Sequence, residues 1–115
     1  MRRGDIYLVD FEPVRGSEVN KARPSVIVSN DGANAVVGRT GRGVITVVPL
    51  TSNTSRVYPF QVLLRAEESG LPRDSKAQCE QVRAMAQERF RRRVGAVPRP
   101  RMAEIDAALR RHLAL

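Results

Sequence analysis

Four short segments in the first half of the chain have the composition of β-strands, and they lie at residues 4–11, 24–30, 43–50 and 59–65. The first alternates with a period of two and is largely apolar on both sides, which predicts a strand covered on both faces. The second and third are rich in β-branched residues. We expect the second to begin at Pro24 and the third to end at Pro49.

The connections between these segments favour an antiparallel sheet. They are clusters of Gly, Pro, Asn and Ser, which are typical of turns between strands. No long helical pattern separates the four segments, so parallel strands joined by helices are not expected.

The second half of the chain has a different pattern. Residues 67–75 (EESGLPRDS) read as a loop, and residues 76–85 have no clean period and leave strand and helix open. Residues 87–95 (QERFRRRVG) predict a short helix that ends at Gly95. A last helix is expected to open at Pro100, with one apolar face formed by Met102, Ile105, Leu109 and Leu113.

Length and composition limit the class of protein. A chain of 115 residues with 42% apolar residues is expected to form one globular domain over residues 1–115. A single cysteine, Cys79, excludes an internal disulfide and a cysteine zinc site, and a single histidine, His112, excludes chemistry that needs two histidines. No apolar run approaches the ~20 residues of a membrane helix, and the start lacks a signal peptide. We therefore expect a small cytoplasmic domain without membrane contact.

The net charge of +8 is concentrated near the C-terminal end. Residues 1–43 carry +2, residues 44–82 carry zero, and residues 83–115 carry +6, densest in RFRRRV. This distribution suggests a polyanionic partner, either nucleic acid or an acidic protein segment. A solvated basic helix face is the alternative, and the charge alone does not decide between them.

Common catalytic motifs fit poorly. The GRTGRG segment at 38–43 has neither the spacing of a P-loop nor that of a dinucleotide site, so a flexible hairpin connection is preferred to a phosphate cradle. The acidic residues near the start, Asp5, Asp10, Glu12 and Glu18, lack the spacing that collects a metal ion. No G-x-S-x-G segment accompanies His112. We expect no metal and no cofactor.

Two polar segments are better candidates. The loop at 12–24 is longer than most loops of compact domains and holds Arg23 immediately before Pro24, which keeps the arginine backbone extended. Residues 48–59 place several hydroxyl and amide groups after the third expected strand. Such groups either form hydrogen bonds with the backbone of a turn or bind phosphate oxygens. Neither segment by itself shows which of the two roles applies.

Taken together, the segments resemble a family. RGDIYLVDFEPVRGSEVNKARPSVIVSND, VPLTSN…YPFQVLL and GLPRDSKAQCEQVRAM are similar, in this order, to the MazF/PemK toxins of bacterial toxin–antitoxin pairs. The resemblance covers roughly residues 3–95. It implies a mainly β (α+β) fold, an SH3-like antiparallel β-barrel with short peripheral helices and a C-terminal helix, and it favours a strand over 77–84. It also implies a homodimer that cleaves single-stranded RNA, especially mRNA, without a metal ion, and an acidic antitoxin that blocks the RNA groove.

The resemblance also suggests roles for individual residues. Arg23 and Thr51 match the family's catalytic pair. RNA-binding positions are matched or adjoined by Arg3, Glu18, Asn20, Lys21, Ser52, Asn53, Glu80 and Gln81. Arg89 matches an antitoxin contact, and we add Arg91 and Arg92 from the same basic run. Many members have Gly-Gly where this chain has Asn20, Lys21 and Ala22. The resemblance therefore supports the RNA contacts of this loop less directly than those of the strands.

The residues allow a metal-free mechanism in which the substrate's own 2′-hydroxyl attacks the phosphate. Arg23 would stabilise the negative charge that develops on phosphorus-bound oxygens, and Thr51 would orient the phosphate. Neither is a suitable base, and Glu18 and Glu80 are open candidates. A non-catalytic inhibitor of DNA gyrase on a similar fold, like CcdB, is the alternative function, and a purely DNA-binding role is disfavoured because no recognition-helix motif is present.

Overall fold

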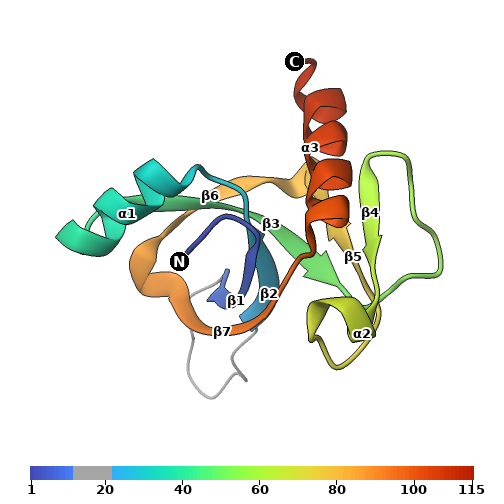
Figure 1. The fold of residues 1–115 in the computed structure, drawn as a ribbon, viewed down its shortest axis with the longest axis horizontal. Coiled ribbons are helices and arrows are strands. Elements are labelled where there is room, and N and C mark those ends of the chain that lie inside the picture. The colour runs from blue at the N-terminus through green and yellow to red at the C-terminus, as the bar shows by residue number, and fades with distance from the viewer. Residues whose placement is uncertain (12–21) are drawn as a thin grey trace.

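The computed structural model describes residues 1–11 and 22–115 of the chain. Its strands are β1 (Asp5–Asp10), β2 (Ala22–Ile27), β3 (Val44–Thr51), β4 (Gln61–Leu64), β5 (Ser75–Gln78), β6 (Arg83–Ala86) and β7 (Phe90–Ala96). The helices are α1 (Asp31–Thr40), α2 (Ala66–Ser69) and α3 (Arg99–Leu113), and the 3₁₀ turns are η1 (Cys79–Gln81) and η2 (Gln87–Arg89). Figure 1 shows α1 and α3 on different sides of a strongly curved sheet.

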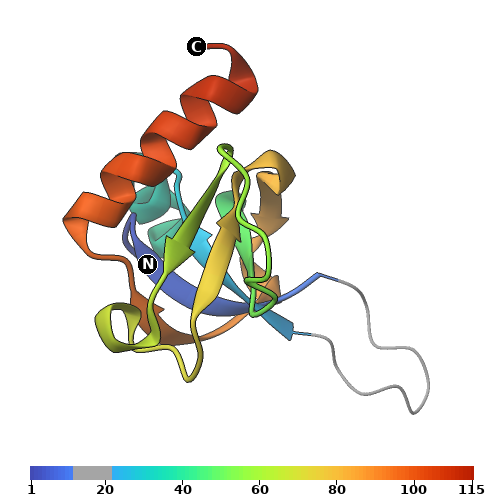
Figure 2. The same ribbon diagram turned by 90° about the vertical axis from the view of Figure 1, so that its right-hand side faces the viewer.

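All described strand pairs are antiparallel, as the turn-rich connections predict. The path through the sheet is β4-β5-β3-β2-β1-β7, and β6 also pairs with β3. One edge of β3 therefore serves two partners in succession: β6 along Val44–Val47 and β5 at Leu50 and Thr51. This long central strand connects the β4–β5 hairpin, which faces the viewer in Figure 2, to the rest of the sheet.

The two prolines lie inside strands, which corrects both expected boundaries. β2 begins at Ala22, two residues before Pro24, and β3 continues through Pro49 to Thr51. On this edge of β3, Pro49 falls between the β6 and β5 ladders, so its missing N–H interrupts neither of them. Thr51 therefore belongs to the strand itself and not to the loop that follows it.

Helix α1 was not expected, because residues 38–43 read as a hairpin connection. Its N-cap is Asn30, whose side-chain oxygen accepts a hydrogen bond from the Ala33 N–H, and Gly41 ends it with a φ of 67°. Both are standard helix-end signals, and Asp31 in the first turn is a third.

The expected helix over 87–95 is wrong. Residues 87–89 form the turn η2, and β7 follows, paired with β1 so that Tyr7 lies opposite Arg93 and Ile6 opposite Gly95. Tertiary pairing outweighs the helix propensity of the arginines. The expected strand over 77–84 is partly correct: η1 divides this region between β5 and β6.

Two apolar clusters lie on opposite faces of the sheet. One is covered by α3 through the buried Ile105 and Ala108, and the other packs against α1 through Val37. In α3, Ile105 is buried and Met102 and Leu109 are partly buried, whereas Leu113 at the far end is half exposed. Pro100 falls in the first turn of α3, which begins one residue earlier than expected.

The expected closed barrel is only partly seen. β6 and β7 are consecutive in the chain and joined through η2, but no ladder in the described ranges connects them. The fold is therefore a curved, mainly antiparallel sheet with three helices. No helix among residues 1–11 and 22–115 has both the length and the apolar character to cross a membrane.

Candidate active site

Arg23 and Thr51 lie on neighbouring strands at the same end of the sheet. β2 and β3 pair with Ser25 opposite Pro49, and continuing this register by two residues places Arg23 opposite Thr51. Directly opposed residues of antiparallel strands point to the same face. The fold therefore brings together the two residues that the resemblance singled out, although they are 28 positions apart.

The same face carries further polar groups across β5 and β4. Lys76 lies opposite Thr51, and Gln78, two residues further along β5, accepts a hydrogen bond of 3.2 Å from the Arg23 guanidinium. Gln78 in turn lies opposite Gln61 on β4. We call five residues the polar row: Arg23 on β2, Thr51 on β3, Gln78 on β5, Gln61 on β4, and Glu80 in the turn η1 that follows β5.

Glu80 forms one end of the polar row. One of its carboxylate oxygens accepts a hydrogen bond of 2.7 Å from the buried side chain of Gln61. Its other oxygen is buried and has no hydrogen-bond partner among the residues that the structure describes. Gln81, in the same turn, is exposed. Burying a carboxylate oxygen without a partner is unfavourable, so this atom is a candidate acceptor for a donor outside the described chain.

The Thr51 hydroxyl is held by the turn that follows it. Its oxygen accepts a hydrogen bond from the Asn53 N–H at 3.3 Å, and the Asn53 side-chain oxygen accepts from the Ser55 N–H and hydroxyl. Accepting this bond leaves the Thr51 hydroxyl hydrogen available for donation. Ser52, next to it, is exposed.

Arg3 does not lie beside the polar row. The N–H of the next residue, Gly4, bonds to the Ile27 carbonyl, four residues from Arg23, which corresponds to about 13 Å along a strand. The Arg3 guanidinium contacts the Val28 carbonyl and the Asp106 carboxylate. A role for Arg3 in RNA binding stays a prediction. The other expected RNA contacts Glu18, Asn20 and Lys21 lie outside the described residues.

The Arg3 backbone also contributes to the start of α1. Its N–H donates to the Asp31 carboxylate at 2.7 Å. This hydrogen bond is the largest influence that lowers the pKa of Asp31.

The arginines expected to contact an antitoxin lie two strands from β2. Arg91 forms an ion pair with Asp10 at 3.1 Å and Arg93 with Asp5 at 3.2 Å, both across the β1–β7 ladder. Arg92 is exposed, and Arg89 lies in η2. Neither side chain forms a hydrogen bond or an ion pair within the part of the chain that the structure describes.

Sequence reasoning missed Gln61, Lys76 and Gln78. Lys76 is buried next to Thr51, and its ammonium donates to the Arg56 carbonyl at 2.6 Å. No local motif identifies these residues, because only the β4–β5–β3 pairing brings them to the site.

Cysteine and metal chemistry receive little support from the described residues. Burial, aided by the negative charge of Glu80, raises the pKa of the Cys79 thiol to about 12, so this buried side chain is a poor nucleophile at neutral pH. Within residues 1–11 and 22–115, no group of three or more His, Cys, Asp or Glu side chains is placed to hold a metal ion.

The polar row suits a phosphate-containing ligand. A half-buried guanidinium and a strand-end hydroxyl point to the same face, and both donate hydrogen bonds. Gln78 fixes one end of the guanidinium, so the remaining N–H groups are oriented before a ligand arrives.

Comparisons with known proteins agree with the resemblance. Residues 2–113 match the family model described as PemK-like, MazF-like toxin of type II toxin–antitoxin system. The chain is 58% identical over 115 residues to a Mycobacterium tuberculosis protein named endoribonuclease MazF9, covering 100% of this chain and 98% of that protein. It is 32% identical over 110 residues to endoribonuclease MazF of Staphylococcus epidermidis, covering 95% and 88%.

Solved structures have the same fold. A MazE–MazF structure from Deinococcus radiodurans has a TM-score of 0.78 at 25% identity and covers 100% of this chain and 96% of that chain. An endoribonuclease of a mycobacterial species, solved with its cognate antitoxin, has a TM-score of 0.74 at 24% identity and covers 100% and 96%.

Proposed function

The chain belongs to the family of PemK-like, MazF-like toxins of type II toxin–antitoxin systems, and from this premise we propose that it cleaves single-stranded RNA at the polar row. It is an endoribonuclease and the toxin of a toxin–antitoxin pair. This assignment is supported by the hydrogen bond from the Arg23 guanidinium to Gln78 and by the β2–β3 register, which, continued two residues beyond Ser25 and Pro49, sets Arg23 opposite Thr51.

The proposed reaction uses the 2′-hydroxyl of the RNA as nucleophile. Its oxygen loses a proton and attacks the adjacent phosphorus, and the bond to the 5′-oxygen breaks. The 5′-oxygen takes up a proton from water, so the products are a 2′,3′-cyclic phosphate and a 5′-hydroxyl. The planar Arg23 guanidinium would bind two phosphate oxygens and stabilise the charge that develops on them. Thr51 would donate its hydroxyl hydrogen to a phosphate oxygen. DNA lacks the nucleophile and is not cleaved.

Glu80 is one candidate acceptor for the proton of the 2′-hydroxyl, and because its unpartnered oxygen is buried, the side chain must turn outward before RNA can reach it. One of its oxygens is fixed by Gln61, and the other has no partner in the described ranges. Glu18 is the second candidate.

The proposed partners follow from the family. We infer that the chain acts as a homodimer in the cytoplasm, where its mRNA substrate is found, and that an acidic antitoxin segment covers the RNA-binding surface. We also infer that the curved sheet corresponds to the SH3-like barrel, because β6 and β7 follow each other directly through η2.

Cleavage of RNA in EDTA tests this function. Purified protein, incubated with a long single-stranded RNA and EDTA, is expected to produce discrete fragments with 5′-hydroxyl ends, because no step uses a metal ion. A DNA strand of the same sequence is the control and is expected to stay intact. Absence of cleavage of any RNA, together with inhibition of DNA gyrase, would contradict the proposal and favour the CcdB-like alternative.

Antitoxin binding is expected to depend on Arg89 and Arg92 more than on Arg91 and Arg93. The last two are already paired with Asp10 and Asp5, whereas the side chains of Arg89 and Arg92 have no partner in the described ranges. Replacing Arg89 and Arg92 with alanine should weaken the antitoxin complex several-fold at low salt and less at high salt.

RNA cleavage by the same double variant is expected to change little. Binding of the cognate antitoxin and cleavage of RNA are measured side by side, with the Arg91→Ala, Arg93→Ala variant as the control. Equal losses of antitoxin binding and of cleavage would show that the two surfaces are not separate.

A further inference from the structure

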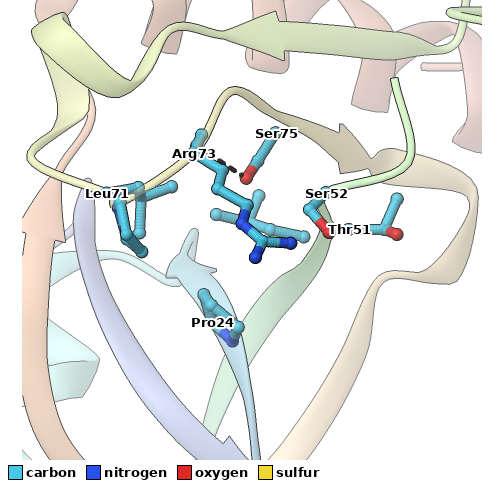
Figure 3. A pocket seen from close by; sticks show the side chains of 8 residues that line it. Pro24, Thr51, Ser52, Leu71, Arg73 and Ser75 are labelled. Carbon is cyan, nitrogen blue, oxygen red and sulfur yellow. Dashed lines mark hydrogen bonds between the residues drawn. The ribbon is translucent and has the colours of Figure 1, made fainter. Parts of the chain in front are cut away.

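A small pocket lies at the end of the sheet where β2 begins and β3 ends (Figure 3). Its volume is about 200 Å³, and it is lined by Pro24, Leu50, Thr51, Ser52, Leu71, Pro72, Arg73 and Ser75. Pro24 and Leu50 directly neighbour Arg23 and Thr51 along their strands. Because successive residues of a strand point to opposite faces, the pocket lies behind the polar row and shares Thr51 with it.

The pocket has an apolar base and one exposed cation. Leu50 and Leu71 are almost completely buried, whereas Arg73 is exposed. Figure 3 shows the Arg73 side chain extending from the loop before β5 towards Ser52, with Pro24 and Leu71 at other sides of the pocket. The Ser75 hydroxyl donates to the Arg73 carbonyl at 3.2 Å, which anchors the backbone of this loop.

The Arg73 guanidinium is available for a ligand. Its neighbour Asp74 does not pair with it: the Asp74 carboxylate contacts Arg65 at 3.6 Å and accepts from the Ala66 N–H. No other side chain in the described ranges bonds to the guanidinium. A planar cation over an apolar surface is an arrangement that stacks on a flat, polarisable ring.

We propose that this pocket binds one unstacked nucleobase of the RNA next to the scissile phosphate, with the Arg73 guanidinium lying on the base. The inference rests on the proposed function and adds a specificity-determining residue to it. The RNA backbone would pass around the strand ends at Thr51 and Ser52, placing the phosphate at the polar row and the adjacent base in the pocket.

The lining favours a base over a bare phosphate or an apolar side chain. A bare phosphate would bond to Arg73 and the hydroxyls at the rim but would leave the apolar surface of Leu50, Leu71 and Pro24 uncovered. An apolar side chain would leave the Arg73 guanidinium without a partner. The volume is below the ~300–1,000 Å³ of pockets that hold whole drug-sized ligands, which fits a single ring system. A base reaches such a pocket only when it is unstacked, so the site would also select single-stranded RNA.

The test combines a protein variant with a substrate variant. Fragment-end sequencing of a mixed RNA pool first identifies the nucleotides flanking the cleavage site that the wild-type enzyme prefers. Arg73→Ala is expected to lower kcat/KM for the preferred oligonucleotide roughly tenfold and to remove discrimination at one flanking nucleotide only. An abasic ribonucleotide at that position should lower kcat/KM of the wild-type enzyme by about the same factor. It should not lower kcat/KM of the Arg73→Ala enzyme any further.

Three comparisons make the result decisive. Arg42→Ala removes an exposed arginine beside the C-terminus of α1 and should leave the preference unchanged. Arg73→Lys keeps the positive charge but lacks the planar guanidinium, so it should behave like Arg73→Ala. If lysine restores the preferred rate, Arg73 contacts phosphate and the base subsite is wrong. The base subsite would also be wrong if Arg73→Ala kept the wild-type nucleotide preference. It would be wrong, too, if the effects of Arg73→Ala and of the abasic substrate on kcat/KM were additive.

Failure of the proposed function gives a different result. A wild-type enzyme that cuts no RNA would overturn both proposals. A wild-type enzyme that cuts RNA with the same preference as Arg73→Ala would overturn the base subsite alone. Thermal unfolding of Arg73→Ala should match wild type, since the side chain is exposed.

Discussion

Replacing Arg23 with alanine should reduce the rate of RNA cleavage at least ~100-fold while leaving the fold intact. This is the usual scale for losing one preorganised hydrogen-bond donor to a developing negative charge. The guanidinium makes one side-chain hydrogen bond in the described ranges, to Gln78, so its removal leaves one half-buried amide to be satisfied by water. The rate is measured in single turnover with excess enzyme, and thermal unfolding checks the fold.

Two further variants separate charge from geometry at this position. Arg23→Lys keeps the charge but cannot bind two phosphate oxygens in one plane, so its rate should lie between those of Arg23→Ala and wild type. Gln78→Ala removes the group that orients the guanidinium and should cause a smaller loss than Arg23→Ala. Arg39→Ala, which removes an exposed arginine on α1, is the control for net charge. A near-normal rate for Arg23→Ala would remove Arg23 from the mechanism.

The strands of the first half were predictable because their pattern is local. Alternation and β-branched runs located β1 to β4, but not all of their ends: β2 begins before Pro24 and stops at Ile27, β3 continues through Pro49, and β4 is shorter than expected. The ends of these strands depend on which neighbouring strand pairs with each edge. The sequence of one segment does not contain that information. Helix α1 could also have been found, since Asn30 and Gly41 are standard end signals on either side of it.

β7 could not be recognised from its own residues. Its arginines have better helix than strand propensity, and its pairing depends on β1, more than 80 residues earlier. Once paired, Arg91 and Arg93 meet Asp10 and Asp5, so the acidic residues of the first strand accommodate the basic run of the last. The sequence suggested one antitoxin-binding group of arginines. In the structure, some of these arginines are paired with acidic residues of β1 and others are not.

The candidate site combines both kinds of information. Arg23 and Thr51 were named from the resemblance, and the β2–β3 register, continued two residues beyond Ser25 and Pro49, sets them opposite each other. Gln78, Gln61 and Arg73 were not named, because each belongs to an ordinary-looking polar segment whose position is set by the β4–β5 hairpin. Long-range pairing therefore contributes the groups that would orient the guanidinium and bind the flanking base.

Gly95→Ala is expected to destabilise the fold strongly. A Cβ at this position would lie 2.3 Å from the Ser69 carbonyl oxygen, a backbone atom at the end of α2, and 3.6 Å from the Cδ1 of Ile6. Gly95 lies opposite Ile6 in the β1–β7 ladder, so β7 cannot move away without breaking strand pairs. Overpacking of this kind costs about 1–3 kcal/mol or more, which corresponds to a fall in Tm of roughly 5–15 °C in a domain of this size.

Gly38→Ala supplies the matched control for this prediction. Gly38 lies within α1, and among the described residues no atom beyond its chain neighbours and the adjacent helix backbone lies within 4 Å of the Cβ that alanine would add. The same chemical change should therefore stabilise the protein by about 0.5–1 kcal/mol, because alanine favours a helix over glycine. Thermal unfolding of both variants measures the contrast. An unchanged or raised Tm for Gly95→Ala would mean that α2 does not pack against β7 through Gly95. A lowered Tm beside a raised Tm for Gly38→Ala would show that Gly95 is required by the close approach of the Ser69 backbone.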